Sequence, residues 1–365
     1  MRRRTTTFAA TLALVATVAA CSGSDAAPAT TTTEPPATTA APTTVVETTV
    51  AATTSVEEAT TTTAAPAAAV FPLTGLPSND DPRALRPALV VKIDNHPQAR
   101  PQSGLNTADI VYEENVEQLT RFAAVFQSND SDPVGPIRSG RTQDIALLSA
   151  LNHPLFAWSG GNGNVTQAIR ASDLIDISVG VVGDDGGYFR DRSISRDVEH
   201  TLYARTQNLF SLTPLFAPPP PAQFQYRVDG VASAGEPSVG VDLAMDGVKV
   251  NWVWDAASGA YLRSQAGKTH NDAALGQVNA VNVVVLEVDY QPSPADARSP
   301  EAQTLGTGIA LVFTGGNVIR GTWTRNDKLQ PFSLVDESGA PILLTAGRTW
   351  VELARVGKTT VGPAA

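Results

Sequence analysis

The sequence predicts an α+β protein, in which a mixed α/β domain precedes a mostly antiparallel β domain. Two observations carry this prediction. In the first half of the folded chain, short apolar runs of strand length are interspersed with segments whose apolar residues recur at helical spacing. In the second half, strand-like runs follow one another and are separated by glycine-rich turns. A run of four prolines lies between the two halves and predicts a linker.

Residues 1–20 have the features of a signal peptide. Three arginines at positions 2–4 precede an apolar stretch that is too short and too rich in threonine to remain as a membrane-spanning helix. It ends in Val-Ala-Ala-Cys21, which resembles a bacterial lipobox, and Cys21 is the single cysteine of the chain. We therefore expect acylation of Cys21 by diacylglycerol and anchoring at the extracytoplasmic face of the cell membrane. An ordinary cleavage site in front of a coincidental cysteine is the alternative.

Residues 21–70 consist mainly of threonine, alanine and proline, and no aromatic residue occurs between Phe8 and Phe71. Such a composition cannot bury enough apolar surface to fold, and prolines favour extended conformers. We expect the lipidated cysteine to be followed by a disordered tether that holds the folded part away from the membrane. Residues 71–365 then remain for folding, which is enough for two domains.

The first predicted domain covers residues 71–216. Its strands are expected at PALVVKID (87–94), ADIVYEENVE (108–117), TRFAAVFQS (120–128) and PLFAWS (154–159). Helices are expected at QDIALLSALN (143–152), NVTQAIRAS (164–172) and TQNLFSL (206–212), and Thr142 is expected to cap the first of them.

The proline run at residues 217–222 is predicted to link this domain to a β-rich domain over residues 223–365. In that second domain the tryptophans at positions 252, 254, 323 and 350 are more typical of a core than of a ligand platform. Its expected strands, in chain order, are FQYRVD, VGVDLAM, KVNWVWD, AYLRS, VNVVVLEVDY, GIALVFT, VIRGTWTR, FSLVD, PILL and TWVELA.

The charge balance excludes some partners. Removal of residues 1–20 leaves 23 basic and 36 acidic residues, a formal net charge of −13. Such a protein is not expected to bind nucleic acid or anionic headgroups by charge alone. No Walker loop, Gly-x-Ser-x-Gly elbow or His-Glu-x-x-His pattern is present, and the four histidines lack ligand spacing. The sequence therefore predicts neither a cofactor nor a metal site.

Charged and amide residues gather where predicted strands end, which is where a rigid scaffold usually carries a site. The segment GPIRSGR places Arg138 and Arg141 on either side of a Ser-Gly pair before the helix at 143. Two guanidinium groups, a hydroxyl and backbone N–H groups entering a helix would suit a carboxylate or phosphate. A network of ion pairs that only holds the loops together is the alternative. The candidate ligand-binding residues from this reasoning are Asn95, Arg100, Gln102, Glu113, Glu114, Glu117, Arg121, Arg138, Ser139 and Arg141.

Several collinear motifs resemble the YerB-like lipoprotein family, which carries a domain of unknown function numbered 3048 and a companion C-terminal domain. They are the run from VVKIDNHPQARPQSG to TRFAAVF, then GPIRSGRTQD, WSGGNGN, GKTHNDAALGQ, GTGIALVFTGGN and GAPILLTAGRTWVEL. The resemblance implies a two-domain lipoprotein anchored at the bacterial surface, without an assigned activity. Before the linker the family often has Pro-His-Asn, whereas this chain has Glu199-His200-Thr201, so only His200 joins the candidate ligand-binding residues.

Two functions are compatible with the sequence. The preferred one is an envelope lipoprotein that binds a cell-wall component or a wall-synthesis partner through the Arg/Glu cluster. The alternative is an extracytoplasmic hydrolase or transferase that acts on a wall glycan or peptide with a glutamate as acid or base.

Overall fold

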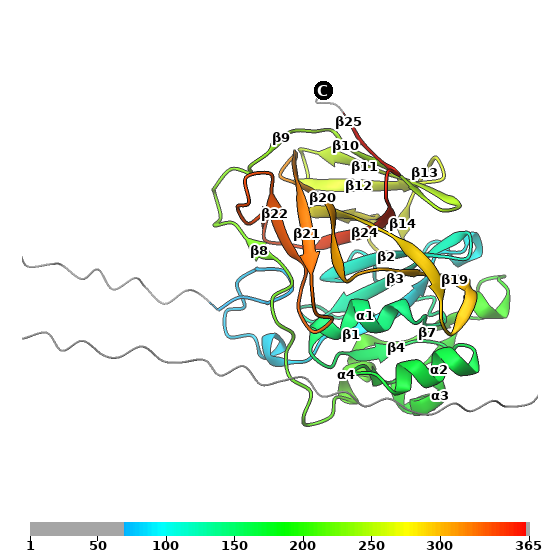
Figure 1. The fold of residues 1–365 in the computed structure, drawn as a ribbon. Coiled ribbons are helices and arrows are strands. Elements are labelled where there is room, and N and C mark those ends of the chain that lie inside the picture. The colour runs from blue at the N-terminus through cyan, green and yellow to red at the C-terminus, as the bar shows by residue number, and fades with distance from the viewer. Residues whose placement is uncertain (1–68, 363–365) are drawn as a thin grey trace, which may run out of the picture. The chain divides into compact units, whose positions relative to one another are not determined.

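The computed structural model describes residues 69–362, which belong to one compact unit (Figure 1). The signal peptide, Cys21 and nearly all of the expected tether lie outside the described residues. Strands predominate over helices, and mixed and antiparallel sheets are both present, so the predicted α+β class is confirmed.

The centre of the molecule is a large mixed sheet of eleven strands, built from both halves of the chain. Its strand order is β22-β21-β20-β17-β24-β2-β3-β1-β4-β5, and β9 pairs with β21. The first half of the chain contributes β1 (Leu89–Asp94), β2 (Ile110–Val116), β3 (Leu119–Phe126), β4 (Leu155–Ala157) and β5 (Ile175–Asp176). The second half contributes β9 (Glu236–Pro237), β17 (Asn282–Val288), β20 (Gly306–Thr314), β21 (Asn317–Arg325), β22 (Ser333–Asp336) and β24 (Thr349–Arg355).

The two predicted domains meet inside this sheet. Strand β2 pairs in parallel with β24, and Ile110 to Glu113 lie opposite Thr349 to Glu352. The expected boundary at residues 217–222 therefore does not separate two independently packed units. The prolines do form a connection without helix or strand, as expected, but the segments that they connect share one sheet and one core.

A second, antiparallel sheet covers one face of the large sheet. Aromatic side chains fill the space between the sheets: Trp252 and Trp350 have ring centroids 5.2 Å apart, and Tyr261 and Phe313 lie 6.2 Å apart. The expected burial of Trp252, Trp323 and Trp350 is confirmed, whereas Trp254 is half-buried. The second sheet consists of β10 (Gly240–Met245), β11 (Val248–Asp255), β12 (Ala260–Gln265), β13 (Lys268–Thr269), β16 (Asn279–Ala280) and β25 (Thr359–Gly362).

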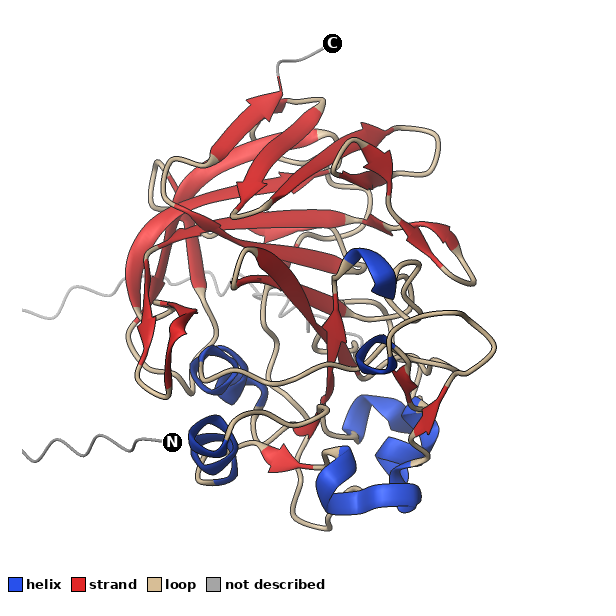
Figure 2. Ribbon diagram, turned by 90° about the vertical axis from the view of Figure 1, so that its right-hand side faces the viewer, coloured by secondary structure: helices blue, strands red, loops and turns tan. Residues whose placement is uncertain are grey.

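The opposite face of the large sheet carries α1 (Gln143–Leu148) and α2 (Gly163–Arg170), and Figure 2 shows the helices gathered toward one end of the molecule. Helix α1 continues into the 3₁₀ turn η3 (Ser149–Leu151), so the expected helix 143–152 is present. Thr142 does not cap it, because its hydroxyl binds Ser293 and Glu301 instead. These partners belong to the hairpin of β18 (Tyr290–Ser293) and β19 (Asp296–Ala302), which the sequence did not predict.

The remaining elements are short and lie mostly in connections. They are η1 (Pro82–Leu85), η2 (Pro97–Ala99), α3 (Val179–Val182), η4 (Gly183–Gly186), β6 (Phe189–Arg190), η5 (Val198–His200), β7 (Leu202–Tyr203), α4 (Thr206–Ser211), β8 (Gln225–Tyr226), β14 (Asn271–Asp272), β15 (Gly276–Gln277) and β23 (Leu343–Leu344).

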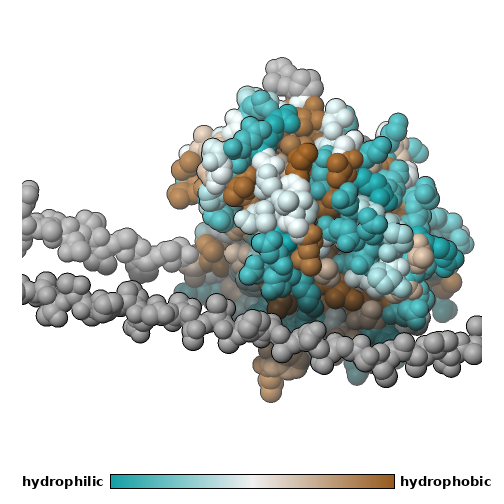
Figure 3. Space-filling model, in the orientation of Figure 1, coloured by the Kyte–Doolittle hydropathy of each residue, from teal (hydrophilic) through white to brown (hydrophobic). Residues whose placement is uncertain are grey.

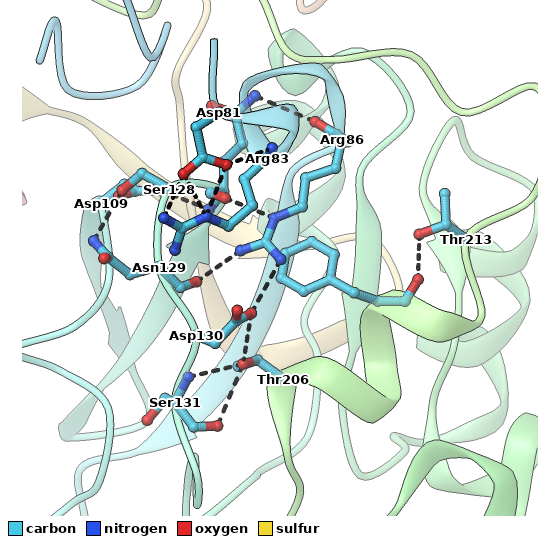
Figure 4. Close-up of polar contacts among 12 residues, drawn as sticks. Asp81, Arg83, Arg86, Asp109, Ser128, Asn129, Asp130, Ser131, Thr206 and Thr213 are labelled. Carbon is cyan, nitrogen blue, oxygen red and sulfur yellow. Dashed lines mark hydrogen bonds and ion pairs between the residues drawn. The ribbon is translucent and has the colours of Figure 1, made fainter. Parts of the chain in front are cut away.

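Arg86 connects the segment before β1 to the residues that follow β3 (Figure 4). Arg86 donates to the backbone oxygens of Gln127 and Asn129, at 2.6 and 2.9 Å, and to Asp130 Oδ1 at 3.0 Å. Its guanidinium also lies 3.6 Å from the centroid of the Phe210 ring. Every one of these contacts is internal, so we assign this cluster a structural role.

The surface carries no extended apolar face in the view of Figure 3, where hydrophobic residues form small separate patches among hydrophilic ones. Within residues 69–362, no helix combines the length and the apolar character that crossing a bilayer requires.

Candidate functional site

The pleat of the large sheet distributes the predicted site residues between its two faces. Successive side chains along a strand point to opposite sides. Glu113 and Glu114 are neighbours in β2 but therefore belong to different environments. Glu114 lies on the face that carries α1, whereas Glu113 lies on the face covered by the second sheet.

On the helix-bearing face, the ends of β1 and β3 bring an aspartate and an arginine together. Asp94 and Arg121 are paired in register, and Arg121 Nη1 donates to the Ser139 backbone oxygen at 2.9 Å. Arg138 Nε lies 3.4 Å from Asp94 Oδ2. We call Asp94, Arg121, Arg138, Arg141 and His200 the arginine cluster.

The arginine cluster holds more positive than negative charge. Burial is the main cause that lowers the pKa of Arg121 to about 10, and the guanidinium groups of Arg141 and Arg138 lower it further. Asp94 and Glu117 only partly oppose them. Glu117 Oε1 accepts a hydrogen bond from Arg141 Nη2 at 3.1 Å, and Glu117 lies in the two-residue turn between β2 and β3.

Two donor groups of the cluster have no acceptor. The Nε atoms of Arg138 and Arg141 are buried, and neither finds a hydrogen-bond acceptor among residues 69–362. Arg138 Nε keeps only its 3.4 Å ion pair with Asp94 Oδ2, so the two buried donors are weakly compensated, and an anion beside the cluster would offset the excess positive charge.

A histidine completes the cluster. His200 Nδ1 lies 2.6 Å from Asp94 Oδ2, and the rings of His200 and His96 are stacked with centroids 4.3 Å apart. The pKa of His96 is lowered, first by burial and then by the neighbouring His200, and the charges of Arg138 and Arg100 act in the same direction. A neutral His96 adds no positive charge to the cluster at neutral pH.

Three backbone N–H groups of the expected anion cradle already have acceptors within the protein. The N–H groups of Arg138 and Gly140 donate to the backbone oxygens of Lys92 and Gly160, and that of Arg141 donates to Asp144 Oδ2. Helix α1 has only six residues. The guanidinium groups and the half-buried Ser139 therefore remain the candidates of this segment for contact with an anion.

Beneath the arginine cluster lies a buried triad, of which only Glu114 was among the sequence-predicted candidates. Lys92 Nζ is 2.6 Å from Glu114 Oε1 and 2.6 Å from Asp144 Oδ1, and all three side chains are fully buried. Burial, followed by the nearby Asp144, raises the pKa of Glu114 to about 8, although Lys92 opposes the shift. A lysine inside the apolar run LVVKID was the signal that could have predicted a buried partner.

The opposite face holds a second buried network, here called the interior network: Asn95, Glu113, Arg263, Gln265 and His270. Arg263 Nη2 donates to Glu113 Oε2 at 2.6 Å. Asn95 and Gln265 exchange hydrogen bonds of 3.0 and 2.9 Å through their amide groups. These bonds join the first half of the chain to the second.

Two pKa shifts in and beside this network, those of His270 and of the adjacent Glu352, favour the neutral forms. Burial lowers the pKa of His270 well below its ordinary value, with Arg263 as the next cause. His270 Nδ1 then accepts from Arg263 Nη1 at 2.6 Å, while Nε2 donates to Gln102 Oε1 at 2.9 Å. Burial, then the adjacent Glu113, raises the pKa of Glu352 well above its usual range.

Arg100 and Gln102 hold the loop after β1. Arg100 donates to both oxygens of Asn95, at 3.2 Å to Oδ1 and 2.8 Å to the backbone oxygen. Gln102 Nε2 donates to the backbone oxygen of Asp94 at 3.0 Å. Both residues therefore brace the loop between the two faces.

The structure thus brings together only part of the predicted set. Arg121, Arg138, Ser139, Arg141 and His200 lie in or beside the arginine cluster, with Glu117 at its rim. Glu114 belongs to the buried triad. Asn95 and Glu113 are members of the interior network, and Gln102 hydrogen-bonds to its His270. Among the described residues, no group of three or more His, Cys, Asp or Glu is arranged to hold a metal ion.

Comparison with known proteins gives consistent matches. Residues 73–214 match the N-terminal domain and residues 241–351 the C-terminal domain of a family described as "Protein of unknown function (DUF3048)". "Putative lipoprotein YerB" of Bacillus subtilis (strain 168) is 30% identical over 294 residues, which cover 77% of this chain and 85% of the relative. The crystal structure of the YerB protein from Bacillus subtilis superposes with a TM-score of 0.70 at 24% identity, over 81% of this chain and 100% of that one.

Proposed function

The chain belongs to the DUF3048 family, and from this premise we propose that it is a membrane-anchored, extracytoplasmic lipoprotein that binds an anionic component of the cell envelope through the arginine cluster. The candidate ligands are wall polymers and peptides that carry phosphate or carboxylate groups.

The anchor is supported by the sequence around Cys21 and by the description of the Bacillus subtilis relative as a lipoprotein. Replacing Cys21 by alanine should remove the acylation site. We expect the Cys21→Ala protein to leave the detergent phase in a phase-partition experiment. An acylated, detergent-partitioning Cys21→Ala protein would contradict the anchor.

The observation that carries the binding proposal is the unbalanced charge of the arginine cluster. Three guanidinium groups face the carboxylates of Asp94 and Glu117, and two buried Nε donors lack acceptors among residues 69–362. Guanidinium groups bind carboxylate and phosphate with matched fork geometry. An anion would therefore balance part of the positive charge that Asp94 and Glu117 leave uncompensated.

The alternative, a hydrolase or transferase with a glutamate as acid or base, has weaker support. Glu113 and Glu114 are fully buried, and their carboxylates are engaged by Arg263 and Lys92. Glu117 is 42% exposed, but it accepts from Arg141 and from Ser299. None of the three combines solvent access with an uncommitted carboxylate.

Binding to purified cell-wall fragments tests the proposal. In co-sedimentation with the full-length chain, we expect Arg138→Gln to weaken binding about tenfold, because hydrogen bonds to a charged group contribute about 1.5–3 kcal/mol. Arg170→Gln is the matched control, since Arg170 pairs with Asp176 at 2.8 Å outside the cluster. Wild-type binding by Arg138→Gln, or equal weakening by both variants, would contradict the proposal.

A further inference from the structure

A cleft lies between the loop after β1 and the hairpin that follows β13. Two adjoining hollows of about 470 and 720 Å³ share Arg100 and Pro101 as a common wall. The smaller hollow is also lined by Lys268 and His270, and the larger one by Arg196 and Tyr203. We call these two hollows the Arg100 cleft. Their volumes are in the range of ligand pockets.

The walls of the Arg100 cleft come from both halves of the chain and are held in place by buried hydrogen bonds. Asp272 Oδ2 accepts from the backbone N–H groups of Gly104 and Asn106, at 2.9 and 3.3 Å. The N–H group of Ala273 donates to the Gln102 backbone oxygen at 2.7 Å. The cleft is therefore formed before any ligand binds, which lowers the entropic cost of binding.

Three cations line the cleft, and none of them has a carboxylate within ion-pair distance among the described residues: Arg100, Arg196 and Lys268. Arg196 donates to the Tyr203 hydroxyl and to the Arg100 backbone oxygen, both at 3.0 Å. Asp191 is the one acidic residue among those that line the two hollows. In a protein with a net charge of −10, this local excess of positive charge favours an anionic ligand.

The remaining lining is partly apolar. Pro97 and Pro101 contribute ring surfaces, and the rings of Phe189 and Tyr203 are stacked with centroids 6.0 Å apart. Asn271 supplies an amide group that suits hydroxyls, whereas the Gln98 amide is bonded to Asp197. Ring surfaces beside an amide and cations match a sugar ring that carries hydroxyl and carboxylate groups.

An extended peptide fits the cleft less well. Peptides that bind as an added strand need a free sheet edge for backbone hydrogen bonds. Of the strands that line the cleft, β6, β7, β13 and β14 have two residues each. The longer β12, which contributes Gln265, is already paired on both sides, with β11 and with β13. We propose that the Arg100 cleft binds a carbohydrate that carries carboxylate groups. This site shares no residue with the arginine cluster and does not depend on it.

Calorimetric titration of the full-length chain with tetragalacturonate tests the proposal, with neutral maltotetraose and a tetraglutamate peptide for comparison. We expect binding of tetragalacturonate and at least tenfold weaker binding of the other two. Lys268→Glu should weaken tetragalacturonate binding about tenfold, because it places a like charge beside the ligand. Lys268 is exposed and outside the core, so this variant should fold normally.

Lys358→Glu is the matched control, since Lys358 is also exposed and lines neither hollow of the Arg100 cleft, and its substitution changes the net charge by the same amount. It should bind tetragalacturonate like the wild type, and so should Arg138→Gln. Equal weakening by Lys268→Glu and Lys358→Glu would overturn the proposal, as would tetraglutamate binding as tightly as tetragalacturonate or no binding of tetragalacturonate. A failure of Arg138→Gln to bind wall fragments, with intact tetragalacturonate binding, separates the two sites.

Discussion

At the scale of single residues, strand alternation decides which charges meet. Glu113 and Glu114 are adjacent in the sequence, yet one pairs with Arg263 and the other with Lys92 on opposite faces of the sheet. Side chains along a strand alternate between its two faces, so two neighbouring glutamates in the run IVYEENV must point to opposite faces. Both faces of β2 are buried, and each glutamate therefore needed a partner from a distant segment.

The buried triad predicts a pH dependence of stability. The pKa of Glu114 rises from 4.5 to about 8 on folding, so between these values the folded state binds the proton more strongly. The stability that this proton contributes is fully present below pH 4.5 and is lost as the pH rises through about 8. Relative to Glu114→Gln, which carries a permanently neutral amide of similar size, the wild type should lose free energy of unfolding between pH 5 and pH 9. Urea denaturation across this range measures the difference, and parallel pH profiles for the two proteins would refute the assignment.

At the scale of elements, the sequence predicted the local segments better than their partners. Strands β1, β2 and β3 lie within or close to the expected ranges, because apolar runs of that length form buried strands. The helix after GPIRSGR is present, but the Thr142 hydroxyl binds the β18–β19 hairpin instead of capping it. The sequence did not predict that hairpin because it contains Pro292 and Pro300, and proline within a segment argues against a strand.

The pairing of β2 with β24 could not be predicted from local patterns, because the paired residues are about 240 positions apart in the sequence. It predicts the behaviour of a chain cut at the proline run. A protease site inserted between Pro219 and Pro220 should allow cleavage, since neither residue lies in a helix or strand. The two fragments should then elute together in size-exclusion chromatography and separate only in denaturant. Separate elution under native conditions would mean that the shared sheet does not hold the halves together.

At the scale of the whole molecule, an acidic protein carries local regions of positive charge. From the net charge of −10 we did not expect nucleic acid as a partner, but this charge did not reveal where the arginines gather. Two pairings bring Arg121, Arg138 and Arg141 together. Arg121 in β3 lies opposite Asp94 in β1, and the segment that leads to Arg138 and Arg141 pairs with β1 through Ile137 and Ile93. The sequence predicted Arg121 as a site residue because it lies near the start of an expected strand. It did not predict Lys92 or Arg263, because they lie inside an apolar run and an alternating run.

Thermal melts of Arg138→Lys with and without inorganic phosphate test the central claim most directly. Lysine keeps the charge but loses the planar fork, and Arg138 makes only a 3.4 Å ion pair with Asp94. Without phosphate, the variant should therefore melt within about 2 °C of the wild type. Saturating phosphate should raise the Tm of the wild type by about 2 °C or more and raise that of the variant much less. An Arg138→Lys protein with a lowered Tm and an undiminished response to phosphate would show that Arg138 braces the loops and does not bind an anion.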